Sequence, residues 1–126
     1  MKRHAKLLGV FLLTLLIPGL SLASARDDAR VMQVRAESAI SAAERVDAER
    51  LATPALQDAR ALFARGQGSL EERDYRDAAR EFERAAADAR LAEARARQQA
   101  SEQSTEELRA AVEALRDEIR KLETDA

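Results

Sequence analysis

The side chains in this sequence that could act as a general acid and base include the adjacent carboxylate pairs Asp27–Asp28 and Glu71–Glu72. Neighbours on a helix point about 100° apart, so neither pair can converge on one substrate atom. Most other acids have a basic residue one turn away, as Glu93 has Arg97, a pattern typical of solvated helix surfaces. We therefore predict that these carboxylates are surface charges and that the protein is not an enzyme.

Residue types that serve nucleophilic or metal chemistry are scarce. The chain has no cysteine, and its one histidine, His4, lies in a segment that we expect to be removed. Gly66-Gln67-Gly68 fails as a phosphate loop, because no strand precedes it and no Lys-Ser or Lys-Thr follows. We interpret these glycines as a close-packing point or a kink, and Tyr75 as a packing residue with its hydroxyl at the surface. The sequence thus predicts no catalytic residue, no metal site and no cofactor.

The N-terminus, residues 1–25, has the pattern of a secretory signal peptide. Basic residues precede an apolar core from Leu7 to Ile17, Pro18-Gly19 interrupts it, and Ala23-Ser24-Ala25 offers the small residues that signal peptidase accepts. We expect cleavage after Ala25 and a periplasmic protein. The alternative is an uncleaved inner-membrane anchor over residues 7–25, close to the ~20 residues that a span requires.

The charge of the mature chain argues against nucleic acid as a partner. Removing Lys2, Arg3 and Lys6 from the 21 basic residues leaves 18 against 23 acidic residues, a net charge of −5. Nucleic-acid-binding proteins usually show the opposite balance, with basic residues gathered on one face.

Apolar residues at helical spacing predict three helices after the signal segment. The first covers 26–52, the second 54–72, with Thr53 as N-cap and Pro54 as first helical residue, and the third starts at Tyr75 with Asp74 as N-cap. The short turn at residues 73–74 makes the second and third helices antiparallel. The predicted packing faces are Ala29, Met32, Ala36, Ala39, Ile40, Ala43 and Val46 on the first helix, and Tyr75, Ala78, Phe82, Ala85, Ala89, Ala92 and Ala96 on the third.

The last 29 residues, 98–126, are predicted to be a polar linker and a short coiled coil. Ser104 begins a capping box, so either a new helix starts there or one long helix runs through. Large apolar residues return at spacings of four and three, as in a coiled-coil seam: Leu108, Val112, Leu115, Ile119 and Leu122. We expect a partner protein or a second copy to cover this seam. The alternative is that it folds back onto residues 29–46.

Two resemblances concern residues 29–97. The spacing of Tyr75, Ala78, Phe82 and Ala85 is similar to that of the second helix of a tetratricopeptide repeat, with Leu62 and Gly66 on the first helix. A closer resemblance, to the bacterial envelope family known as domain of unknown function 4398, rests on Thr53-Pro54-Ala55-Leu56, Arg73-Asp74-Tyr75 with Ala78, and the segment 88–96.

The family resemblance implies export to the cell envelope. Members are typically exported, often as lipoproteins, and some continue through a coiled segment into an outer-membrane-protein-A-like domain that binds peptidoglycan. This chain resembles such a protein cut short at Ala126, and it lacks the lipid-bearing cysteine. The resemblance brings no catalytic residues.

These observations together predict an all-α protein: a signal peptide over 1–25, an antiparallel helical bundle or hairpin with tetratricopeptide-like packing over 26–97, and the C-terminal coiled-coil helix. Its expected function is that of an exported, non-catalytic scaffold or interaction protein. A periplasmic peptide-binding adaptor and an inner-membrane-anchored helical protein are the alternatives.

Overall fold

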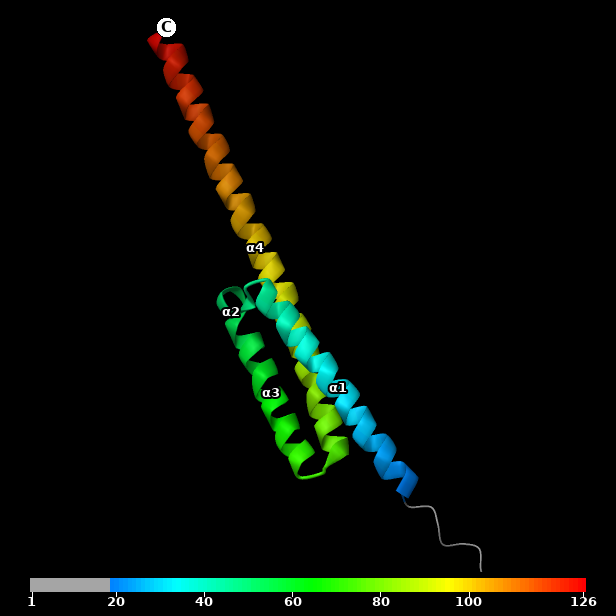
Figure 1. Ribbon diagram of the computed structural model, residues 1–126. Coiled ribbons are helices and arrows are strands. Elements are labelled where there is room, and N and C mark those ends of the chain that lie inside the picture. The colour runs from blue at the N-terminus through cyan, green and yellow to red at the C-terminus, as the bar shows by residue number, and fades with distance from the viewer. Residues whose placement is uncertain (1–18) are drawn as a thin grey trace, which may run out of the picture.

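The computed structural model describes residues 19–126, with side chains from Ser24 onward, and every regular element among them is a helix. The elements are α1 (Gly19–Arg45), α2 (Ala48–Leu51), α3 (Thr53–Glu71) and α4 (Tyr75–Asp125). In Figure 1, α1, α3 and the first part of α4 form a bundle, and the rest of α4 projects from it as a single rod that ends at the C-terminus. The all-α prediction is confirmed.

Helix α4 is the central element of the bundle. It packs along both α1 and α3, whereas α1 and α3 contact each other much less. Ala29 of α1 shares a buried cluster with Ala78, and Ala43 shares one with Ala92. Helices α1 and α4 therefore run parallel, and α3 runs antiparallel to both (Figure 1).

Alanine fills the contact between α1 and α4. Fully buried alanines recur every seven residues on each helix, a period that keeps one stripe facing a parallel neighbour. Methyl side chains allow the two helix axes to approach closely, because the interaxial distance depends on the side chains at the contact. These residues are Ala29, Ala36 and Ala43 on α1, and Ala78, Ala85 and Ala92 on α4.

Phe82 is the largest fully buried side chain and fills the space between α3 and α4. Its ring centroid lies 5.2 Å from that of Phe63, with the planes tilted by 52°. Gly66 is buried against the same ring, and a β-carbon there would come within 2.7 Å of Cε1 of Phe82. Gly66 is therefore the predicted close-packing point, whereas a β-carbon at Gly68 would have no such neighbour within 4 Å.

The predicted first helix over 26–52 was wrong at its C-terminal end. Helix α1 stops at Arg45, Asp47 adopts a left-handed conformation with φ of 59°, and the separate short helix α2 follows. This break turns the chain so that Ala48 and Ala52 join Ala92 in the buried cluster at the upper end of the bundle. Burial of these alanines offsets the cost of a left-handed aspartate, roughly 1–2 kcal/mol for an L-residue.

The predicted N-cap of the second helix was also misplaced. Thr53 is the first helical residue of α3, and Ala52 occupies the N-cap position. The Thr53 hydroxyl donates to the carbonyl oxygen of Glu49 at 2.5 Å, and so it stabilises the end of α2 instead of the start of α3.

A three-residue turn, residues 72–74, joins α3 to α4. Arg73 has a left-handed φ of 65°. The Arg73 amide donates to the Leu70 carbonyl at 3.2 Å, and the Asp74 amide donates to the Ser69 carbonyl at 2.8 Å. This pair of bonds is the Schellman ending of a helix. The Asp74 side chain accepts from the Asp77 amide at 3.4 Å, which confirms Asp74 as the N-cap of α4.

Helix α4 continues without a break through the polar run at 98–107. Ser104 does not start a new helix, and Thr105 instead donates its hydroxyl to the Ser101 carbonyl one turn back, at 2.9 Å. All residues from Arg97 to Ala126 are exposed. The alternative that residues 108–122 fold back onto α1 is therefore wrong.

Candidate interaction surface

The exposed part of α4 carries an apolar seam, which we define as Leu108, Val112, Leu115, Ile119 and Leu122. Their side chains are between 45% and 66% exposed, although the residue types are those normally found in cores. At 100° per residue, the seam lies roughly 110° around α4 from the face that carries Phe82 and Ala89. The bundle therefore cannot cover the seam, and the structure leaves it accessible.

The seam has the residue pattern of a coiled coil with positions labelled a to g. Val112 and Ile119 occupy a, while the three leucines occupy d. The flanking e and g positions, which face a partner helix, hold Arg109, Ala111, Arg116, Glu118, Glu123 and Asp125.

Ion pairs line one flank of the seam. Arg109 contacts Glu106 at 2.7 Å, Arg116 contacts Glu113 at 2.5 Å, and Arg120 contacts Asp117 at 3.0 Å. All are exposed pairs three residues apart, and such pairs contribute only ~0–1 kcal/mol each. They therefore add little to the stability of the rod, and its large apolar side chains remain exposed.

The predicted packing residues separate into two groups in the structure. Ala78, Phe82, Ala85 and Ala89 are fully buried within the bundle and are inaccessible to a partner. The five seam residues are exposed on the rod. Among the predicted residues, therefore, the accessible ones are the five seam residues and the partly buried Tyr75.

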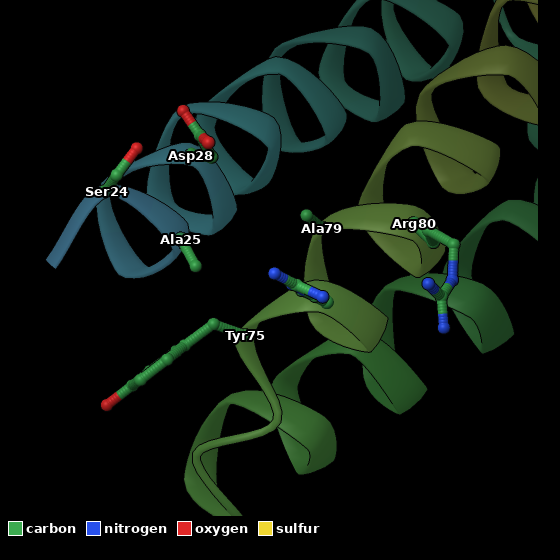
Figure 2. Close-up of a pocket in the computed structure, with 7 residues that line it drawn as sticks. Ser24, Ala25, Asp28, Tyr75, Ala79 and Arg80 are labelled. Carbon is green, nitrogen blue, oxygen red and sulfur yellow. The ribbon is translucent and has the colours of Figure 1, made fainter. Parts of the chain in front are cut away.

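Tyr75 lines a shallow cavity between the starts of α1 and α4 (Figure 2). Ser24, Ala25 and Asp28 form the α1 side, with Arg76, Ala79 and Arg80 beside Tyr75 on α4. The Tyr75 ring extends outward, with its hydroxyl pointing away from both helices. Arg80 is engaged with Asp77 on its own helix. No group of polar side chains converges in this cavity, and cleavage after Ala25 would remove part of its wall.

One charged cluster was missed by sequence reasoning. The Arg60 guanidinium of α3 lies 2.7 Å from Glu44 at the end of α1 and 2.6 Å from Glu49 of α2. The hydrogen bond that Arg60 donates to Glu44, aided by the one to Glu49, raises the pKa of Arg60 above its ordinary value, while desolvation opposes this rise. The cluster therefore links three helices at the α1–α2 break.

Residues 19–126 contain neither a metal-binding group of side chains nor a helix that could span a membrane. No group of three or more His, Cys, Asp or Glu side chains in this part of the chain is arranged to hold a metal ion. None of the helices described for these residues is long and apolar enough to cross a membrane. The proposed anchor over residues 7–25 lies mostly outside the described residues.

Comparison with protein families identifies the family of this chain. The family model described as Domain of unknown function (DUF4398) matches residues 32–108, well over half of the chain. The chain belongs to this family. Its matched region runs from α1 through the bundle and along α4 to Leu108, the first seam residue. Comparisons with curated proteins and with solved structures give no match.

Proposed function

We propose that this protein is an exported, non-catalytic module of the bacterial envelope, in which the bundle holds a C-terminal rod whose seam binds another helix. The observation that carries the proposal is the seam itself: five large apolar side chains at heptad spacing, all exposed and all beyond the bundle. An exposed apolar surface of this kind usually marks a binding site.

The difference between the buried part of α4 in the bundle and its exposed part in the rod supports this function. The α4 face inside the bundle is filled by alanines and by Phe82, and so the bundle core has no room for a ligand. The same helix continues into the rod, which fixes the direction in which the seam points. The bundle thus fixes the orientation of the rod, and binding takes place on the rod.

The proposed export rests on the N-terminal segment. Its basic start, apolar core and small residues at 23–25 are the features that the secretion machinery recognises. Fractionation of cells into periplasm, cytoplasm and membrane tests this part of the proposal directly, and recovery in the cytoplasm would contradict it.

Crosslinking in intact cells tests the seam. A photoreactive phenylalanine analogue in place of Ala111, beside the seam, should capture whatever helix lies there. The double substitution Leu115→Asp and Ile119→Asp should abolish this crosslink, because it places charges on a surface that must become dry.

The matched control is Ala110→Asp with Ala114→Asp, which adds the same charge to the same helix outside the seam. This control should retain the crosslink. Equal crosslinking in both double variants would show that the seam does not bind a partner.

A further inference from the structure

We infer that the helix bound at the seam is the seam of a second copy, and that the two rods pair antiparallel with their bundles at opposite ends. This inference deepens the proposed function, on which it rests, by naming the partner. Three features of the rod carry it: the residue types in the seam, the charges beside it, and the position of the seam relative to the bundle.

The residue types suit a helix–helix interface. In the antiparallel pair each a residue packs against a d residue, so Val112 and Ile119 both meet leucines of the second copy. Both β-branched residues and all three leucines are exposed and available.

The antiparallel arrangement covers every seam residue with an apolar neighbour. Centring the dimer on residue 117 places Leu115 against Ile119 of the second copy, and Val112 against Leu122 of the second copy. Leu108 then meets Ala126 of the second copy. Each contact occurs twice because the pairing is symmetric.

The flanking charges favour this arrangement over its competitors. It sets Arg109 against Glu123 of the second copy, twice, while like charges meet only on the symmetry axis, at Arg116 and at Glu118. Arg109 and Arg116 also pair with Glu106 and Glu113 on their own helices, at 2.7 and 2.5 Å, which moderates both the attraction and the Arg116 repulsion. Charges at e and g positions set the orientation of coiled coils.

The competing arrangements place like charges opposite each other beside the seam, without the attractive Arg109–Glu123 contacts. A parallel in-register pair sets Glu118 against Glu123 of the second copy twice, and residues 105–126 offer no opposite pair in return. An antiparallel pair shifted by one heptad toward the bundles sets Arg109 against Arg116, and Glu102 against Glu123. Like-charge contacts of this kind are destabilising. The opposite shift leaves Leu108 and Val112 without a partner in the seam of the second copy.

The position of the seam also suits antiparallel pairing. Ala126 of one copy reaches residue 108 of the other, and the buried part of α4 ends at Ala96. About 18 Å of helix therefore separates each bundle from the end of its partner, at 1.5 Å per residue. The bundles do not meet, and nothing in the bundle obstructs the pairing.

The rod is helical before it pairs. Because α4 is nucleated within the bundle, association does not include the unfavourable first turn that limits short isolated helices. The interface is nevertheless short, so we expect reversible association at micromolar concentrations or above, as for other small interfaces.

Charge reversal provides the first test, by sedimentation equilibrium of the purified full-length protein from about 1 μM to about 1 mM. Glu123→Arg replaces two attractive contacts by two repulsive ones in the antiparallel dimer, and should weaken it roughly tenfold. Adding Arg109→Glu should restore the affinity of the parent. In a parallel dimer Glu123→Arg would instead strengthen association, because it removes the repulsion with Glu118, and that result would overturn the proposed orientation.

A spin label provides the second test. The chain has no cysteine, so Ala126→Cys gives one labelling site per copy. The antiparallel dimer predicts a label-to-label distance of about 27 Å, from 18 residues at 1.5 Å each. Double electron–electron resonance spectroscopy measures this distance. Labels in direct contact would show parallel pairing and overturn the inference.

A protein that remains monomeric up to about 1 mM would overturn self-association altogether. The Ala111 crosslink in cells keeps that failure separate from failure of the proposed function. If the crosslink persists in cells while the purified protein is monomeric, the seam binds a different protein. If the crosslink is absent as well, the seam is not a binding surface.

Discussion

Gly66 of α3 and Phe82 of α4 are packed so closely that a β-carbon at position 66 would lie 2.7 Å from Cε1 of the phenylalanine ring. The contact lets α3 approach the largest buried side chain of the bundle, and Phe63 of the same helix also packs against the ring, with the two ring centroids 5.2 Å apart. It sets the spacing of the α3–α4 pair, whereas alanine sets that of α1 and α4.

Gly66→Ala should therefore destabilise the protein even though alanine is the better helix former. Overpacking costs about 1–3 kcal/mol, which exceeds the gain of about 1 kcal/mol in helix propensity. Gly68→Ala is the matched control, since that position is open, and it should raise the melting temperature. Thermal melts followed by circular dichroism measure both, and a stabilised Gly66→Ala variant would contradict the close contact.

Phe82→Ala should cost about 3–5 kcal/mol, the usual range for truncating a fully buried aromatic residue. The loss includes the packing against Phe63, and it is large enough to unfold a small domain. Arg84→Ala, on the exposed side of the same helix, should leave the melt nearly unchanged. Equal denaturant midpoints for Phe82→Ala and the parent would show that the ring does not support the bundle.

Arg73→Gly should stabilise the protein by up to about 1 kcal/mol. Arg73 has a φ of 65°, which glycine adopts without the steric cost that a β-carbon incurs. Arg84→Gly is the control, because glycine inside a helix costs about 1 kcal/mol relative to alanine. Urea titrations of both variants should shift in opposite directions, and a destabilised Arg73→Gly variant would mean that the arginine side chain contributes more than its backbone strain costs.

The exported protein should begin at Arg26. Loss of Ser24 and Ala25 would remove part of the α1 wall beside Tyr75 but none of the buried alanine stripe, which starts at Ala29. The bundle should therefore melt at nearly the same temperature with and without residues 19–25. Intact mass spectrometry of the periplasmic protein determines the start, and a membrane species that retains Met1 would support the anchor hypothesis.

The helix faces could be predicted from the sequence because their spacing follows the geometry of the helix. Phe82 and its neighbouring alanines lie on the buried face as expected, and Asp74 caps α4 as its type and position suggested. Each of these features depends on residues within one or two turns of each other.

Features that depend on contacts between distant residues could not be predicted. Aspartate adopts the left-handed region more readily than most residues, but its residue type alone does not place a helix break at Asp47, where the turn brings Ala48 and Ala52 into the cluster with Ala92. The partners of Arg60 come from two other helices. The continuity of α4 through its polar run was undecided because a capping box can also lie inside a helix that is already formed.

The unbroken α4 helix fixes a length as well as a direction. From Arg97 to Asp125 it extends about 44 Å from the bundle, at 1.5 Å per residue. Anything held at the seam is therefore kept at a set separation from the bundle, as by a spacer of defined length. Inserting seven residues into 98–104 would lengthen this spacer by about 10 Å and turn the seam by only about 20°. Inserting two residues would turn the seam through more than half a circle while adding about 3 Å. Separation and orientation in this protein can thus be varied independently.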